Sequence, residues 1–386
     1  MFDYNLDILY NLSKLGVKLA NKIKYILDIG SSSLRLLATN LYNGKPRIIA
    51  EETVLYDGYM DGEFLSPNQL DEVLIALLQN MTNKMRKPIN KLIVGVPNDF
   101  CVCVCKRISR RYTNVKKITE QDLNNLYKSN MSFGDSEEYV VVNYSPMQYL
   151  LDDNITTLEP VGKKTSSIML DVSYILARKS FYDLMGEKLT GLGIKEIEFI
   201  STSLGQAMKC EPKKQNKPFV ILDVGHITTN VSVYKGEGLA LMSSFSMGGG
   251  HISSDLMQLL NLSFKNAELI KRKVILTIES NRNEHYEVCS KGNLIKAPIN
   301  MTNQIVKSRI EMIAQVVNNI LTQDYLFKDL DIYLTGDGLS NFKGARNIIK
   351  EVTGLNVYEY KIPFDSSTSK YQTSKMGLAE LANVAI

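Results

Sequence analysis

One pattern of apolar and polar positions occurs at two distant places in the chain. An apolar run over residues 219–222 ends at Asp223, small and hydroxyl-bearing residues follow, and a second strand-like run, VSVYKG, begins at Val231. Residues 25–39, YILDIGSSSLRLLAT, show the same order around Asp28. Each copy predicts a β-hairpin whose turn presents a carboxylate, hydroxyl groups and outward-pointing backbone N–H groups. One such turn is common in ordinary hairpins, but two predict a duplicated fold whose halves face each other across a nucleotide.

Helical periodicity and further strand-like runs divide the rest of the chain. A helix is predicted to begin at Ser66 and Pro67 and to stop at Pro88. Short strands around one helix, which Thr119 caps, predict an inserted α+β subdomain. The predicted boundaries of the two-lobed α/β fold are an amphipathic helix at 1–24, a first subdomain at 25–96 and 171–212, the insertion at 97–170, a third subdomain at 217–246 and 323–386, and a fourth at 247–322.

Residues 2–24 form the most amphipathic segment of the chain. At 100° per residue a stripe of leucine, isoleucine and phenylalanine falls on one face, and Lys14, Lys18 and Lys22 gather opposite. Such a pattern predicts a helix that lies on an anionic lipid surface. It equally fits a helix that docks on its own domain or on a neighbouring subunit, so both alternatives are kept.

Other turns and helices supply further candidate residues. Residues 248–250 are three glycines before a predicted helix, an arrangement that lets backbone approach a ligand and also occurs in plain flexible turns. Gly336 and Gly338, in the turn of IYLTGDGLS, leave room for a flat base against the backbone. Gln206 lies on a short helix before the second hairpin, where an amide either orients a water molecule or simply faces solvent.

Composition narrows the class of protein. The chain has 386 residues, too many for one ordinary core, with 44% hydrophobic and 22% charged residues. Its net charge of +4 is too small to indicate a nucleic-acid partner. No apolar run approaches the roughly 18 residues that span a bilayer. Five cysteines, an odd count, with no signal-peptide pattern predict the reducing cytoplasm, and packing is the expected role of Cys101, Cys103 and Cys105.

The ordered motifs resemble the actin/Hsp70/sugar kinase superfamily and, within it, the FtsA family of bacterial cell-division proteins. The resemblance rests on KKITEQDL, EYVVVNYSPMQYLLDD, SMGGGHISSDL, the AELIK helix, IVKSRIEMI and LTGDGLSNFKG, together with the two hairpins. It implies an actin-like two-lobed duplicated fold of subdomains 1A, 2A and 2B, with the insertion as a 1C-type subdomain. It also implies a protein that binds ATP with Mg²⁺, polymerises, and tethers a ring of tubulin-like FtsZ to the membrane.

The resemblance further implies which residues contact the ligand. Asp28 and Asp223 would hold a hydrated Mg²⁺ ion and Gln206 would orient the attacking water, so these three are the candidate catalytic residues. The other implied nucleotide contacts are Gly30, Ser31, Ser32, Ser33, Gly225, Thr228 and Thr229 for the phosphates, Gly249, Gly250, Glu268 and Lys271 for the ribose and base, and Gly336 and Gly338 for the adenine.

Three departures from the family pattern change the expectations. FtsA-like chains carry a C-terminal linker and amphipathic membrane helix, whereas here the amphipathic segment is at residues 2–24, so we expect an N-terminal membrane anchor. Asp337 replaces a usual glycine and is expected to weaken or reorient adenine binding. His226 replaces a small residue beside the phosphates, so turnover is expected to be slow or absent.

The favoured hypothesis is a cytoplasmic ATP-binding protein that is peripheral on the inner face of the cell membrane. Its expected partners are copies of itself in a filament, an FtsZ-like tubulin homologue, and an anionic membrane surface contacted through residues 2–24. Three alternatives remain: a PilM-like pilus-assembly protein, a plasmid-segregation actin, and a small-molecule kinase of the same fold. The kinase has the least support, because no acidic general base marks a second substrate pocket.

Overall fold

A computed structural model describes residues 23–133, 137–152, 155–210, 217–278, 284–323, 330–361 and 372–384. Residues 1–22, which hold nearly all of the predicted amphipathic helix, lie outside the described residues. Among the residues that the structure describes, no helix is both long enough and apolar enough to cross a bilayer.

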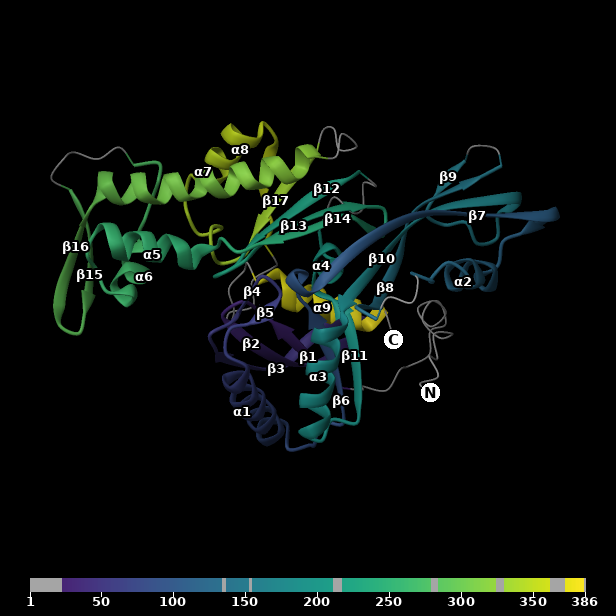
Figure 1. Cartoon of the computed structure of the whole chain (residues 1–386), viewed down its shortest axis with the longest axis horizontal. Coiled ribbons are helices and arrows are strands. Elements are labelled where there is room, and N and C mark those ends of the chain that lie inside the picture. The colour runs from purple at the N-terminus through teal and green to yellow at the C-terminus, as the bar shows by residue number, and fades with distance from the viewer. Residues whose placement is uncertain are drawn as a thin grey trace.

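Two five-stranded mixed sheets with the same topology form two lobes (Figure 1). The first sheet contains, in spatial order, β11 (Glu196–Ser201), β6 (Lys91–Val96), β1 (Lys24–Ile29), β2 (Ser33–Tyr42) and β3 (Lys45–Leu55). The second contains β18 (Asn356–Glu359), β17 (Asp331–Thr335), β12 (Phe219–Val224), β13 (Thr229–Lys235) and β14 (Gly238–Phe245). In both, three parallel strands are followed by two antiparallel ones. The duplicated two-lobed arrangement predicted from the hairpins is therefore confirmed.

Helices separate and cover the two sheets. Between the sheets lie α4 (Thr202–Ala207) and α9 (Thr373–Val384), whose apolar side chains share one core with Ile26 of β1 and Ile221 of β12 (Figure 1). The outer face of the first sheet packs against α1 (Pro67–Met85) and α3 (Lys179–Gly191). The outer face of the second packs against α7 (Ile299–Gln323) and α8 (Ala345–Thr353). The layers thus run helix, sheet, helix, sheet, helix.

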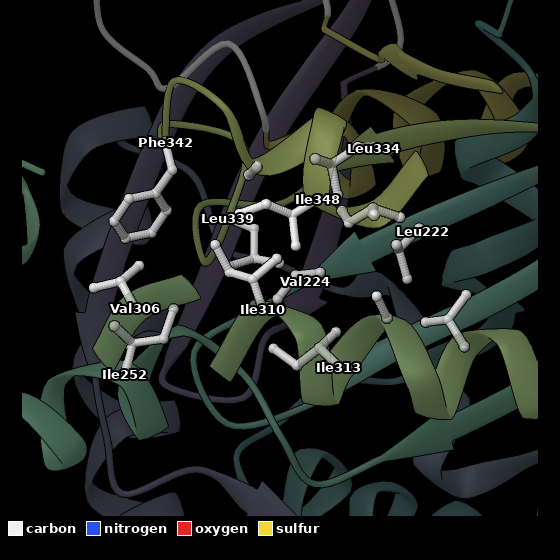
Figure 2. Packing of buried hydrophobic residues seen from close by; sticks show 14 of the residues in the cluster. Leu222, Val224, Ile252, Val306, Ile310, Ile313, Leu334, Leu339, Phe342 and Ile348 are labelled. Atoms are coloured by element: carbon white, nitrogen blue, oxygen red, sulfur yellow. The ribbon is translucent and has the colours of Figure 1, made fainter. Parts of the chain in front are cut away.

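The core of the second lobe follows from the periodicity of α7. Val306, Ile310 and Ile313 recur at helical spacing and are completely buried in one core with Leu222 and Val224 of β12. In Figure 2 Ile310 lies next to Val224, and Val306 lies next to Ile252. The lobe is completed by α5 (Gly249–Leu259), α6 (Phe264–Lys271) and the hairpin of β15 (His285–Ser290) and β16 (Asn293–Pro298). This core holds the second hairpin rigidly from its outer side.

The insertion is a separate sheet that extends from the first lobe (Figure 1). Its antiparallel strands are, in spatial order, β7 (Cys101–Lys117), β10 (Lys164–Arg178), β8 (Tyr139–Leu151) and β9 (Thr156–Thr157). One face packs against α2 (Glu120–Lys128), which begins with the cap predicted at Thr119; the structure shows a capping box formed by Thr119 and Asp122. The short helix η1 (Asn98–Phe100) joins β6 to β7, and the small hairpin of β4 (Tyr59–Met60) and β5 (Glu63–Phe64) precedes α1. Because β10 continues past residue 171 to Arg178 and leads into α3, the insertion and the first lobe share one unbroken strand.

The alternating cysteines lie where β7 passes β14 of the second lobe. The Cys103 thiol donates to the Leu239 carbonyl at 3.2 Å, and the Cys105 sulfur is 3.5 Å from the same oxygen. The described residues contain no group of three or more histidine, cysteine, aspartate or glutamate side chains suited to a metal ion. The contacts of Cys103 and Cys105 are those of packing between the insertion and the second lobe.

A contact between two glycines sets the distance between the central helices. A Cβ atom on Gly377 of α9 would lie 2.5 Å from the carbonyl carbon and oxygen of Gly205 of α4, and a Cβ on Gly205 would lie 2.8 Å from the carbonyl carbon of Gly377. Only glycine at both positions lets the backbones meet. Since Gln206 follows Gly205, the same contact determines where the Gln206 side chain lies.

We predict that Gly377→Ala lowers the free energy of unfolding by about 1–3 kcal/mol, because the added methyl group forces two packed helices apart. Gly186→Ala is the matched control, since Gly186 lies in helix α3 with nothing within 4 Å of its Cβ position. That control is expected to stabilise the protein by roughly 0.5–1 kcal/mol through helix propensity. Urea unfolding of both variants measures the difference, and equal effects would contradict the packing role of Gly377.

Candidate functional site

Strand alternation turns both hairpin aspartates toward the central helices. On β1, Ile26 packs in the central core, so Asp28, two residues later, faces the same way. On β12, Ile221 and Asp223 repeat this relation. Each carboxylate therefore lies at the end of its strand, one from each lobe, next to the start of α9.

Asp28 is buried, with 1% of its surface exposed, and has two partners. Arg35 Nη1 donates to Asp28 Oδ2 at 3.0 Å, and Ser374 Oγ of α9 donates to the same oxygen at 3.0 Å. Arg35 was not among the residues expected from the sequence, although it stands directly opposite Asp28 in the register of β1 and β2. That register is the signal that identifies it, since paired residues of a hairpin share one face. A guanidinium at this position suits a phosphate.

Asp223 belongs to a chain of hydrogen bonds that reaches α9 and β17. Gln206 Nε2 donates to Asp223 Oδ2 at 2.5 Å and to Thr373 Oγ1 at 3.2 Å, and the hydroxyls of Thr373 and Thr335 lie 3.1 Å apart. The Tyr360 hydroxyl donates to the backbone carbonyl of Gln206 at 2.6 Å. Both amide protons of Gln206 are thereby committed, and its Oε1 is the atom left to accept a hydrogen bond. The structure thus brings the predicted pair of Gln206 and Asp223 together.

Burial raises the pKa of Asp223 to about 6. The hydrogen bond from Gln206 lowers the pKa, and the negative charges of Asp28 and Asp337 raise it further. A carboxylate held in this way is stabilised by a nearby cation.

The turns of the two hairpins touch. The Ile227 N–H of the second turn donates to Ser31 Oγ of the first turn at 3.1 Å. Ser31, Ser33 and Thr228 are buried between the turns and their strands, whereas Thr229 Oγ1 points away and donates to the Met247 carbonyl at 2.5 Å. Thr229 therefore fastens the second hairpin to the segment before α5. The Ser32 carbonyl accepts the Tyr56 N–H at 3.2 Å, which secures the first turn.

The predicted glycines of three turns meet backbone to backbone. A Cβ on Gly249 would lie 2.7 Å from Gly338 Cα, and one on Gly338 would lie 2.4 Å from the Gly225 carbonyl oxygen. Gly336, whose φ is +85°, has Asp223 Oδ1 2.3 Å from its Cβ position. The sequence suggested that these glycines make room for a ligand. The structure shows that they make room for one another, and so bring the ends of β12, β17 and α5 together.

Glu268, which is partly buried, and Lys271, which is buried, form an ion pair beside these turns. Lys271 Nζ donates to Glu268 Oε1 at 2.5 Å and to the Gly249 carbonyl at 2.9 Å, and Ser253 Oγ also donates to Glu268 Oε1. Burial lowers the pKa of Lys271, and the charge of Glu268 opposes that shift. The pair is thus fixed against the first turn of α5 rather than free on the surface. Asp337 lies nearby and accepts a hydrogen bond from Gln372 Nε2 at 3.2 Å.

The donor set suits a hydrated magnesium ion. Mg²⁺ is usually held by one or two carboxylates, several water molecules and substrate phosphates. Asp28 and Asp223 supply the two carboxylates, and Ser31 and Arg35 lie where phosphates would complete the set.

Comparison with known proteins gives a consistent result. The family model described as "Cell division protein FtsA" matches residues 220–375. The protein named "Cell division protein FtsA" from Enterococcus faecalis is 24% identical over 343 residues, which cover 86% of this chain and 77% of that protein. The protein of the same name from Streptococcus pneumoniae is 22% identical, covering 86% of this chain and 74% of its own.

Solved structures share the fold. The PilM–PilN type IV pilus biogenesis complex aligns with a TM-score of 0.59 at 15% identity, covering 95% of this chain and 98% of that one. MreB5 of Spiroplasma citri bound to ADP aligns at 0.54 with 11% identity, covering 93% and 96%. The MamK double helical filament aligns at 0.51 with 13% identity, covering 93% and 98%. At these identities the likeness concerns the fold, which is the actin-like fold predicted from the motifs. In sequence the chain is thus similar to FtsA proteins over most of its length, and in structure it has the actin-like fold.

Proposed function

We propose that this protein binds ATP with Mg²⁺ between its two lobes and assembles into actin-like filaments that tether an FtsZ-type division ring to the membrane. The observation that carries the proposal is the meeting of two equivalent hairpins, each with its aspartate, beside Gln206. Structures of the same fold are described as bound to ADP and as a filament, and the curated relatives are named as cell-division proteins.

The phosphates are proposed to bind between the two turns. Residues 31–33 and Thr228 supply hydroxyl and N–H groups, and Arg35 supplies a positive charge. The Ile227 N–H of the second turn is a further donor, and it now donates to Ser31 Oγ. A phosphate oxygen would take the place of the Ser31 hydroxyl as its acceptor. Asp28 and Asp223 would hold the hydrated Mg²⁺ that neutralises the phosphate charge.

Gln206 is proposed to position the water that attacks the last phosphate. Its two amide protons are used by Asp223 and Thr373, so Oε1 accepts a hydrogen bond from the water. An amide positions water without removing its proton. We therefore expect hydrolysis to be slow, in keeping with a protein that works by assembly.

The base and ribose are proposed to lie between α5, α6 and the turn at residues 336–338. The Glu268–Lys271 pair is fixed there against Gly249, and the glycine contacts hold the three elements together. Asp337 lies in the same turn and is expected to bias the orientation of the adenine.

We predict that Arg35→Ala weakens the binding of Mg-ATP by roughly 10- to 100-fold, because a charge-assisted hydrogen bond to phosphate is lost. Arg107→Ala is the matched control, since Arg107 pairs with Asp171 on the insertion and is 66% exposed. Isothermal titration calorimetry measures both. Equal affinities for Arg35→Ala and the wild type would contradict the phosphate role of Arg35.

We also predict a characteristic pH dependence of stability without nucleotide. The pKa of Asp223 is raised from 3.8 to about 6, so the folded protein binds a proton there that the unfolded chain releases at lower pH. The contribution of Asp223 to the free energy of unfolding is therefore greatest at low pH and is lost as the pH rises through about 6. Between about pH 5 and pH 7.5 it should fall by roughly 1 kcal/mol.

Urea unfolding of the wild type and Asp223→Asn at both pH values tests this expectation. The asparagine cannot titrate, so the wild type should lose more stability than the variant over the interval. Parallel pH dependences would show that Asp223 titrates near its ordinary value.

Membrane attachment is proposed to run through residues 2–24. Lysines opposite a leucine stripe suit anionic lipid, and attachment there would place the protein on the inner face of the cell membrane. We predict that the full chain sediments with anionic liposomes in the presence of Mg-ATP and that a chain without residues 2–24 does not. A full-length variant with Lys14, Lys18 and Lys22 changed to glutamate tests whether binding requires the positive charges of the segment or only its presence.

Electron microscopy of the lipid surface should then show filaments of the full chain. If neither chain binds lipid while both bind ATP, the segment docks on protein and the membrane part of the proposal fails. If the truncated chain binds lipid as well as the full chain does, the attachment lies elsewhere.

A further inference from the structure

A lysine is completely buried in the first turn of α9. Lys375 has 0% of its surface exposed. Its Nζ donates to Glu51 Oε1 at 3.2 Å and to Glu51 Oε2 at 3.0 Å, so the ammonium group is paired with both oxygens of one carboxylate on β3. A charge in a protein interior is costly even when it is paired. Neither residue is among those proposed to contact the nucleotide, so the pair needs another explanation.

Strand register places Glu51 close to Arg35. Glu51 is opposite Leu37 in the pairing of β2 and β3, and Arg35 lies two residues before Leu37 on the same face of β2. Arg35 and Glu51 are therefore diagonal neighbours on one face of the sheet, a separation that long side chains can bridge. Arg35 thus has two carboxylates within reach, Asp28 directly opposite on β1 and Glu51 diagonally across on β3.

The structure divides these two carboxylates between two cations. Arg35 Nη1 donates to Asp28 Oδ2 at 3.0 Å, while Glu51 is held by Lys375. Burial lowers the pKa of Lys375, and its hydrogen bond with Glu51 opposes that shift. The charges of Arg35 and Asp28 also act on Lys375, so the four groups lie close together.

We propose that Lys375 is a positioning residue that occupies Glu51 and thereby leaves Arg35 available to the nucleotide phosphates. The inference rests on the proposed ATP site, in which Arg35 contacts phosphate. Without the ammonium group, Glu51 would remain as a carboxylate that is only 20% exposed, and Arg35 is a cation within its reach. The guanidinium would then turn toward β3, and the phosphates would lose a charged donor.

Calorimetric titration with Mg-ATP of Lys375→Met and of the double variant Lys375→Met/Glu51→Gln tests the proposal. Lys375→Met should weaken binding roughly 10-fold, because Glu51 then competes with the phosphates for Arg35. The double variant should bind Mg-ATP as the wild type does, since the amide of a glutamine has no charge with which to hold the guanidinium. In an Arg35→Ala background, Lys375→Met should cause no further loss of affinity.

The matched control is Lys84→Met. Lys84 pairs at 2.7 Å with Glu52, the next residue of β3, and its side chain is 49% exposed. Adjacent residues of a strand face opposite ways, so this substitution removes a lysine–glutamate pair of β3 on the other face of the sheet. It should leave the affinity for Mg-ATP unchanged. Urea unfolding of every variant records the loss of stability separately from the loss of affinity.

Two results would overturn the inference while leaving the ATP site intact. If Lys375→Met binds Mg-ATP as tightly as the wild type, or if adding Glu51→Gln does not restore a lost affinity, the ion pair only holds α9 in place. If Lys375→Met does not fold, Lys375→Gln takes its place, because its amide still donates to Glu51 but carries no charge. Wild-type affinity in that variant would overturn the inference equally. Failure of the wild type to bind Mg-ATP would overturn the proposed ATP site itself, and the inference with it.

Discussion

The site depends on the close approach of three backbone turns that have no side chains between them. Gly249 N–H donates to the Gly225 carbonyl at 2.9 Å and Gly338 N–H donates to the Val224 carbonyl at 2.8 Å, so the turn after β12 is hydrogen bonded on both sides. A Cβ at Gly249 or Gly338 would overlap the neighbouring backbone. The position of Asp223 is therefore determined jointly by β12, α5 and β17. The second hairpin is fixed within the second lobe.

The first lobe meets this assembly through a second glycine contact. Gly205 and Gly377 let α4 and α9 touch, and this contact brings Gln206 to Asp223 and Ser374 to Asp28. Each central helix thus reaches one of the two carboxylates. A ligand that binds both aspartates would contact both lobes at once.

The insertion is also attached to the second lobe, because the short helix before its first strand is hydrogen bonded to that lobe. Asn98 Nδ2 donates to Ser232 Oγ at 3.2 Å, and Ser244 Oγ donates to Asp99 Oδ1, so η1 is hydrogen bonded to both β13 and β14. β7 leaves directly from η1. The base of the insertion is therefore hydrogen bonded to β13, which is a strand of the second hairpin, and to the neighbouring strand β14.

Local patterns in the sequence were enough to predict the two hairpins, the inserted sheet, and Asp28 and Asp223 at equivalent strand ends. Strand alternation and turn composition are local properties, so they can be read along the chain. Tertiary structure alone decided that Ser374 contacts Asp28 from 346 residues away and that Thr373 holds Gln206. It also decided that the glycines pack on one another and that the His226 ring lies over Gly250. These contacts join elements whose proximity depends on how both sheets pack on α4 and α9, and no local pattern encodes that packing.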